Sequence, residues 1–150
     1  MKIISACLCG VNCKYNGSNN YIPHLKELAE KEEWLLLCPE TIGGLPVPRL
    51  AYEIRGGTGI DVIAGYARVV DANGRDLTEF FLNGAYKVLV MAKNAGVDCA
   101  VLKSRSPSCG AGRIYDGSFK SILTDGDGVT AALLKLHNIN VVNEEDYFKE

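Results

Sequence analysis

The stretch 77–102, LTEFFLNGAYKVLVMAKNAGVDCAVL, joins a helical pattern directly to a short apolar run. Apolar residues recur at three- and four-residue steps through 77–94, and this period predicts an amphipathic helix. Gly96 stands where the C-cap of such a helix belongs. The apolar run at 99–102 predicts a strand that is buried on both sides. A helix that leads into a buried strand is typical of βαβ units, which pair their strands in parallel.

The same alternation extends over the rest of the chain. We expect strands at 2–6, 34–37, 67–70, 99–102 and 139–142, and helices at 23–33, 77–94 and 129–136. Pro23 suits the first turn of its helix, and Asp127 is expected to cap the last helix. Loops are predicted at 7–22, 39–65 and 103–115, and the length of 39–65 is typical of a functional loop. The pattern therefore predicts an α/β domain with a mostly parallel sheet of about four to five strands and helices on both faces.

Length and composition fit one globular domain that spans residues 1–150. Hydrophobic residues make up 47% and charged residues 23% of the chain, close to the average of folded domains. The chain has 16 Lys and Arg against 18 Asp and Glu, so no excess of positive charge is available for a nucleic-acid backbone. No apolar run approaches the ~20 residues of a membrane helix, and residues 1–7 do not resemble a signal peptide. We therefore expect a cytoplasmic protein whose main partner is neither a nucleic acid nor a membrane.

Six cysteines, at positions 7, 9, 13, 38, 99 and 109, are the unusual feature of this composition. A cytosolic domain of this size does not need disulfides, so the alternatives are metal ligation, nucleophilic catalysis and core packing. Cys7 and Cys38 directly follow expected strands, and Cys109 lies in the loop after a third. The carboxyl ends of parallel strands meet at one edge, where α/β proteins bind ligands. Three thiols that converge there suit a metal or cluster site, whereas Cys99 inside a strand is expected to be a core residue.

Cys9 and Cys13 form with Cys7 a C-x-C-x-x-x-C segment that could bind a metal by itself. The C-x-x-C pairs of structural zinc sites and the cysteine runs of ferredoxins are both absent from the sequence. The spacing alone therefore leaves open which of these three thiols would be a ligand.

Glu40 is the acidic residue best placed for chemistry beside the cysteines. It lies two residues after Cys38, and Pro39 between them favours an extended backbone that aims both side chains into one cleft. A carboxylate beside a metal site commonly acts as a general base on water. The simpler interpretation is an exposed loop glutamate, which we would prefer if the cysteines were absent.

Three serines, Ser104, Ser106 and Ser108, precede Cys109 in the loop 103–115. Their hydroxyls and backbone amides could hold an anion or a heterocycle, or they could form a simple turn. Both histidines of the chain fall at the ends of expected helices, so we expect them at the surface. Their placement weakens a Cys–His hydrolase interpretation.

Six short motifs follow one another along the chain. They are Ser5-Ala-Cys7-Leu, Cys13-Lys-Tyr-Asn-Gly17, Cys38-Pro-Glu40, Gly43-Gly-Leu-Pro-Val-Pro-Arg49, Ser106-Pro-Ser-Cys109-Gly110 and Gly126-Asp-Gly-Val-Thr130. Together they closely resemble the thiouracil desulfidase family, long known as a bacterial domain of unknown function, over essentially the whole chain. The resemblance implies a Rossmann-like fold of three layers that holds an oxygen-sensitive [4Fe–4S] cluster on only three cysteines. The fourth iron of such a cluster is free to bind the sulfur of a substrate, and no electron is consumed overall.

The resemblance also implies roles for individual residues. It places the cluster ligands on Cys7, Cys38 and Cys109. Glu40 and Ser106 match the family's acid–base and supporting positions, so both are predicted to be catalytic.

Arg49, in the fourth motif, is predicted to contact the substrate together with Ser104 and Ser108. The sequence departs from the family at Cys9, where leucine is usual, and at Asn16, where aspartate is common. The implied function is the iron–sulfur-dependent, non-redox desulfuration of a thiolated pyrimidine, 2-thiouracil-like or 4-thiouridine-like, with release of sulfide.

Two functions of other classes use the same thiols. One is a non-catalytic metal-binding or redox-sensing module, which a colourless protein with stoichiometric zinc would favour. The other is a hydrolase with Cys109 as its nucleophile, which activity without any metal would favour.

Overall fold

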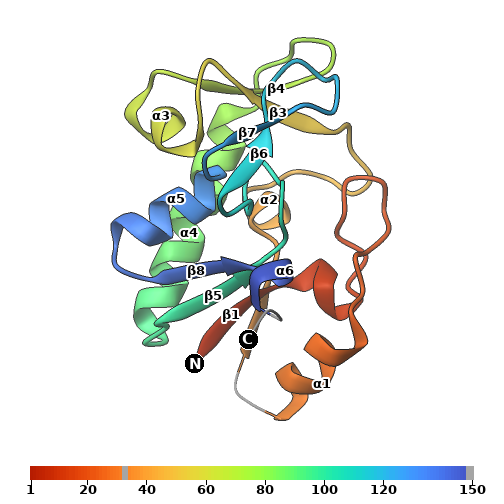
Figure 1. Cartoon of the computed structure of the whole chain (residues 1–150), viewed down its shortest axis with the longest axis vertical. Coiled ribbons are helices and arrows are strands. Elements are labelled where there is room, and N and C mark those ends of the chain that lie inside the picture. The colour runs from red at the N-terminus through yellow and green to blue at the C-terminus, as the bar shows by residue number, and fades with distance from the viewer. Residues whose placement is uncertain (32–33, 148–150) are drawn as a thin grey trace.

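A parallel sheet lies at the centre of the computed structural model, which describes residues 1–31 and 34–147 (Figure 1). Its four strands are β1 (Lys2–Ser5), β2 (Trp34–Leu37), β5 (Cys99–Leu102) and β8 (Asn140–Asn143). They lie in the order β2–β1–β5–β8, and every neighbouring pair is parallel. The register places Ile3 of β1 beside Leu35 on one side and Ala100 on the other. The predicted α/β fold with a mostly parallel sheet is therefore confirmed.

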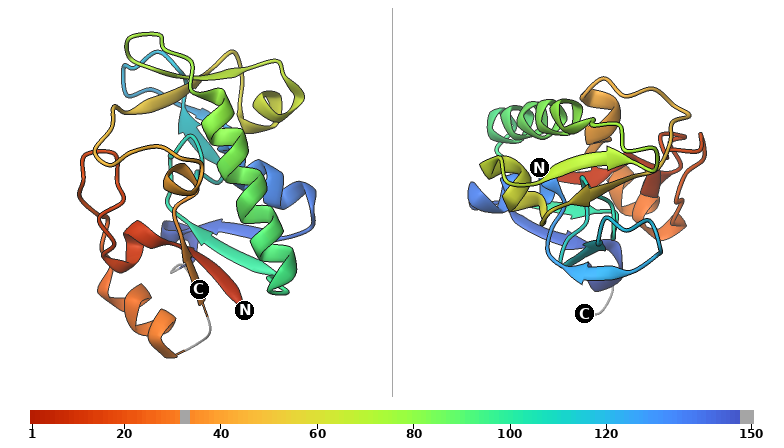
Figure 2. Two further views of the ribbon diagram at one scale, coloured as in Figure 1. Left: turned by 180° about the vertical axis from the view of Figure 1, so that it is seen from behind. Right: turned by 90° about the horizontal axis from the view of Figure 1, so that it is seen from above.

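Helices cover both faces of this sheet. On one face lie α4 (Thr78–Asn94) and α5 (Val129–Leu136), and on the other lie the short 3₁₀ helix η1 (Ala6–Cys9) and α1 (Pro23–Lys31). Successive side chains of a strand point to opposite faces, so Ile3 packs in the cluster of α4 and α5 whereas Ile4 packs with η1 and α1. Figure 2 shows α4 running across the sheet in the view from behind. The expected three layers are present.

Two small antiparallel sheets lie beyond the parallel sheet, at the top of Figure 1. One pairs β3 (Tyr52–Arg55) with β4 (Arg68–Asp71), and the other pairs β6 (Arg113–Tyr115) with β7 (Leu123–Asp125). The two remaining short helices that precede β4 are α2 (Pro39–Ile42) and α3 (Gly59–Ala64), and α6 (Glu144–Tyr147) follows β8. Each strand of the small sheets is only three or four residues long. Such a strand depends for its stability on pairing with its neighbouring strand and on packing against the rest of the fold.

The prediction that 39–65 is one irregular loop is wrong. It contains α2, β3 and α3, and α3 begins with a capping box in which Thr58 N donates to Asp61 Oδ2 at 2.8 Å. The predicted loops 7–22 and 103–115 likewise contain η1 and β6. The expected helix 23–33 is α1 as far as Lys31, and residues 32–33 lie outside the described part of the chain.

Asp127 does not cap α5, contrary to the prediction. Gly128 is the N-cap residue, and Asp127 Oδ1 instead accepts from Gly112 N at 2.8 Å and from Lys135 Nζ at 3.0 Å. The helix starts so close to the preceding loop that a Cβ on Gly128 would lie 2.6 Å from the Ser108 carbonyl. Backbone carbonyls of that loop therefore occupy the place of a side-chain cap.

Two glycines bring α2 against α4. A Cβ on Gly43 would lie 2.1 Å from Phe80 O, and a Cβ on Gly84 would lie 2.1 Å from Pro39 O. Only glycine allows backbones to approach this closely. The contact fixes Pro39 and therefore the Cys38-Pro39-Glu40 segment relative to the long helix. Among the described residues, no helix has both the length and the apolar character needed to cross a membrane.

Candidate functional site

A cavity of about 450 Å³ opens where β1, β2 and β5 end, below the two small sheets. Four cysteines line it: Cys7, Cys13, Cys38 and Cys109. Glu40 and Ser106 line it as well, so the structure brings together all five residues that were predicted to be ligands or catalytic. This volume is typical of small-molecule sites.

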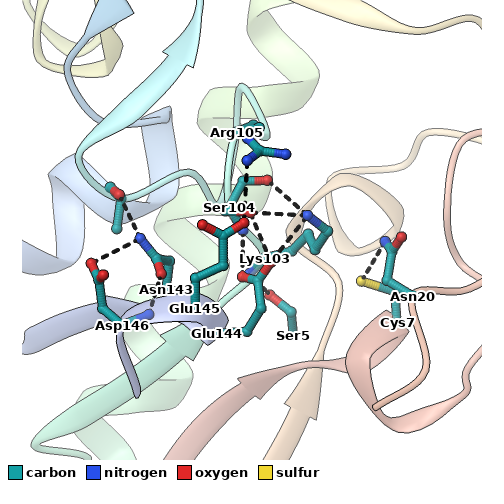
Figure 3. A network of polar contacts seen from close by, with 11 residues as sticks. Ser5, Cys7, Asn20, Lys103, Ser104, Arg105, Asn143, Glu144, Glu145 and Asp146 are labelled. Carbon is teal, nitrogen blue, oxygen red and sulfur yellow. Dashed lines mark hydrogen bonds and ion pairs between the residues drawn. The ribbon is translucent and has the colours of Figure 1, made fainter. Parts of the chain in front are cut away.

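Cys7 lies in η1, directly after β1, and its side chain is buried. The side-chain amide of Asn20 donates to Cys7 Sγ at 3.4 Å (Figure 3). A hydrogen bond from the Cys13 thiol lowers the pKa of Cys7 to about 7; burial opposes this shift, while Asn20 and the charge of Lys103 support it. A substantial fraction of Cys7 is therefore thiolate at neutral pH, the form that binds metals.

Cys38 follows β2 and is the N-cap residue of α2. A hydrogen bond from the Cys13 thiol lowers the pKa of Cys38 to about 5, against the opposing effect of burial. Hydrogen bonding with Cys38 and with Cys7, together with burial, raises the pKa of Cys13 itself. The structure thus places a fourth thiol, Cys13, in the same cavity as the predicted ligands, and Cys38 Sγ lies 3.8 Å from Cys13 O.

Cys109 is held in place by the loop that precedes it. Ser106 Oγ accepts from Ser108 N at 3.1 Å and from Cys109 N at 3.0 Å. The first amides of α5 donate to the Pro107 and Ser108 carbonyls, with Val129 N at 2.7 Å from Pro107 O. Burial raises the pKa of the Cys109 thiol. Because two amides fill the acceptor sites of the Ser106 hydroxyl, its remaining capacity is to donate a hydrogen bond.

Glu40 and Arg49 form a buried ion pair beside the thiols. Arg49 Nε donates to Glu40 Oε2 at 3.1 Å, and Nη2 donates to the same oxygen. Burial raises the pKa of Glu40, and the Arg49 guanidinium opposes that rise. Glu40 Oε1 accepts no hydrogen bond within the described residues, so one carboxylate oxygen remains for the cavity.

Arg49 also donates to the carbonyls of Pro46 and Cys13, at 3.1 Å each. Its side chain is only 2% exposed, and these bonds direct it toward the protein. Its predicted contact with substrate stays a prediction. The geometry shows that it orients Glu40 and ties the Cys13 segment to the cavity wall.

The serines that were predicted to contact substrate lie differently from one another. Ser104 lines the cavity, and its hydroxyl donates to Glu144 Oε1 at 2.7 Å (Figure 3). Ser108 does not line the cavity, because its hydroxyl is buried against Thr130 Oγ1 at 2.8 Å. Cys9 is buried in the cluster beside α1 and does not line the cavity either.

Cys99 begins β5, at the amino edge of the sheet, and is half-buried rather than a full core residue. Both histidines, His24 and His137, are exposed, as expected.

Lys103 is a site residue that the sequence did not reveal. It lines the cavity, and its ammonium lies 3.0 Å from Ser104 Oγ and 3.1 Å from Glu144 Oε1. In Figure 3 this ion pair lies in the centre, beside Ser104, and Cys7 and Asn20 lie to its right. Burial acts to raise the pKa of Glu144, but hydrogen bonds from Ser104 and the charge of Lys103 outweigh it and lower the pKa. No motif announces this pair, because its two members are about 40 residues apart in the sequence.

The donor set fits a thiolate-bound cluster. Soft thiolates suit iron, and hydrogen bonds to the sulfurs, such as the one from Asn20, tune such centres. No group of three or more His, Cys, Asp or Glu side chains in the described chain is placed to hold a single metal ion. A cluster is bound differently, because each thiolate binds a different iron and the ligands surround a body of several atoms.

The fold and the site together define a Rossmann-like α/β protein that gathers thiols and a carboxylate at the carboxyl edge of its sheet. The family model of 2-thiouracil desulfurase matches residues 3–146. The uncharacterized protein YbbK of Bacillus subtilis (strain 168) is 43% identical over 146 residues, 97% of each chain. The solved structure of the [4Fe-4S]-dependent thiouracil desulfidase TudS matches with a TM-score of 0.85 at 40% identity, over 96% of this chain and 90% of that chain. The chain belongs to the 2-thiouracil desulfurase family, as its six motifs indicated.

Proposed function

We propose that this protein is a [4Fe–4S]-dependent desulfidase that converts the thione of a thiolated pyrimidine to a carbonyl and releases sulfide. The observation that carries the proposal is the cavity itself, in which Cys7, Cys38 and Cys109 surround a space next to the free oxygen of Glu40. The family and its desulfidase member with a cluster support the same reaction. Water is the only co-reactant, since C=S and H₂O give C=O and H₂S without transfer of electrons.

Cys7, Cys38 and Cys109 are the three ligands in this proposal. When bound, the cluster supplies an iron without a protein ligand, a soft Lewis acid for the sulfur of the thione. Cys13 lines the same cavity but is not a ligand in this proposal.

Glu40 Oε1 takes the proton from the attacking water, and its carboxylate is held by Arg49 on the other oxygen. Ser106 donates its free O–H to the oxygen or sulfur that gains negative charge at the substrate carbon. When the carbon–sulfur bond breaks, the proton on Glu40 passes to the departing sulfur, which leaves as hydrosulfide. The remaining hydroxyl proton of the adduct goes to solvent as the carbonyl forms. The residues of the chain thus supply a base, a donor and an anchor for the base.

Turnover of 2-thiouracil by the reconstituted protein in ¹⁸O-water, without oxygen and without any reductant, tests this reaction. We expect sulfide and uracil in equal amounts, with one ¹⁸O atom in each uracil. Absence of label from the uracil, or a requirement for a reductant, would contradict hydrolytic desulfuration.

A further inference from the structure

Glu53 is a second carboxylate in the wall of the cavity, and the proposed reaction does not use it. It belongs to β3 and is 9% exposed. Its Oε1 accepts from Gly117 N at 3.0 Å and from Phe119 N at 3.2 Å. Both donors lie in the turn between β6 and β7, so Glu53 ties that turn to β3.

The turn is held in one conformation by its backbone and by Arg55. Phe119 and Ser121 have φ angles of 59° and 60°, a left-handed conformation that is costly for residues other than glycine. A Cβ on Gly117, at φ 92°, would lie 2.4 Å from Ile54 O. Arg55 Nε donates to Gly117 O at 3.1 Å, and its guanidinium lies 5.5 Å from the centre of the Phe119 ring. The result is a fixed aromatic side chain in the cavity wall.

The second oxygen of Glu53 is open to the cavity. Oε2 accepts no hydrogen bond from any described residue. Within the same residues, no buried side-chain oxygen or nitrogen lacks a hydrogen-bond partner. Oε2 is therefore reached by solvent, and Glu53 lines the cavity. A carboxylate acceptor and an aromatic ring thus stand side by side in one wall.

We propose that Glu53 and Phe119 form the subsite that recognises the ring of the substrate. Glu53 Oε2 accepts a hydrogen bond from a ring N–H beside the thione carbon, and the ring stacks on Phe119. This inference rests on the proposed function and narrows its substrate to flat heterocycles with an unsubstituted N–H next to C=S. An ionised carboxylate only accepts hydrogen bonds, so it favours the N–H of the thione tautomer over a bare ring nitrogen. Stacking on an aromatic ring is available to any pyrimidine.

Glu53→Gln is the decisive variant, since its amide oxygen can still accept from Gly117 and Phe119. An NH₂ donor then replaces the acceptor that faces the cavity. We expect binding of uracil, measured by calorimetry on the cluster-loaded protein, to weaken about 10- to 100-fold. The KM for 2-thiouracil should rise by the same factor, with a smaller effect on kcat. Glu79→Gln, an exposed position on α4, is the matched control and should leave both values unchanged.

Two further comparisons separate the contact from a general disturbance. In the wild type, 1,3-dimethyl-2-thiouracil, which has no ring N–H, should bind more weakly than 2-thiouracil. In Glu53→Gln this preference should disappear, because methylation of the substrate and substitution of Glu53 remove the same hydrogen bond. Phe119→Leu leaves a non-glycine residue in the same left-handed backbone conformation but removes the aromatic ring. It should weaken pyrimidine binding about tenfold through lost stacking.

The outcomes distinguish the subsite from the reaction. If Glu53→Gln binds uracil and 2-thiouracil as tightly as the wild type, the subsite is overturned while the desulfidase function stands. If the wild type binds pyrimidines and the variant does not, but neither releases sulfide, the subsite is supported and the proposed reaction fails. If the wild type binds neither pyrimidine, the subsite is overturned as well.

Discussion

Replacing Cys38 with alanine is expected to leave less than about a tenth of the wild-type iron and no sulfide release above background. The thiol lies at the carboxyl end of β2, and its lowered pKa of about 5 keeps it ready to bind metal. A cluster held by only three cysteines keeps just two protein ligands when one of them is removed. Mutation of residues that merely support metal ligands already lowers metal affinity about 10- to 100-fold, so loss of a ligand itself should cost more. The measurement is iron and acid-labile sulfide per chain after anaerobic reconstitution, beside the rate of sulfide release.

Two other cysteines provide matched controls for this experiment. Cys9→Ala removes a buried thiol that does not line the cavity, and Cys99→Ala removes one at the opposite edge of the sheet. Both should keep full iron. Full iron in Cys38→Ala would contradict the ligand set and favour Cys13, which lines the same cavity, as a ligand.

Glu40→Gln is expected to lower the rate of sulfide release by about 10²–10⁴-fold, the usual contribution of a general base. The substitution keeps the shape of the side chain, and the amide oxygen still accepts from Arg49. The nitrogen that then faces the cavity cannot take a proton from water. Iron content and thermal stability should stay near those of the wild type, which distinguishes lost chemistry from a lost cluster.

The control for this prediction is Glu27→Gln, an exposed acidic residue on α1. It should release sulfide at the wild-type rate. A Glu40→Gln protein that is equally fast would remove Glu40 from the mechanism and leave its ion pair with Arg49 as a structural contact.

The central sheet and its covering helices were predictable because each is encoded locally. The helical period of 77–94 and the apolar run at 99–102 predict α4 and β5 almost to the residue. By contrast, β3 was missed although Tyr52-Glu53-Ile54-Arg55 alternates apolar and polar residues. Four residues between proline- and glycine-rich segments are too short for this alternation to stand out. The capping box at Thr58 and Asp61 was a signal for α3 that the sequence did contain.

The thiol site was predictable in outline for a topological reason. Parallel strands end at a common edge, so cysteines that follow β1, β2 and β5 had to converge. The finer assignments depend on contacts between distant segments. Ser108 bonds to Thr130 instead of lining the cavity, and the Oε1 atom of Glu53 anchors a turn more than 60 residues away. Such hydrogen bonds between distant segments follow from the packed fold and cannot be predicted from spacing in the sequence.

The most direct test of this account is a titration of the anaerobically reconstituted wild-type protein with 2-thiouracil, followed by visible absorption. We expect about four iron and four sulfide per chain and a spectral change with 2-thiouracil that uracil does not produce. A colourless protein with one zinc per chain would contradict it in favour of a metal-binding module. Release of sulfide by a metal-free protein would contradict it in favour of a Cys109 nucleophile.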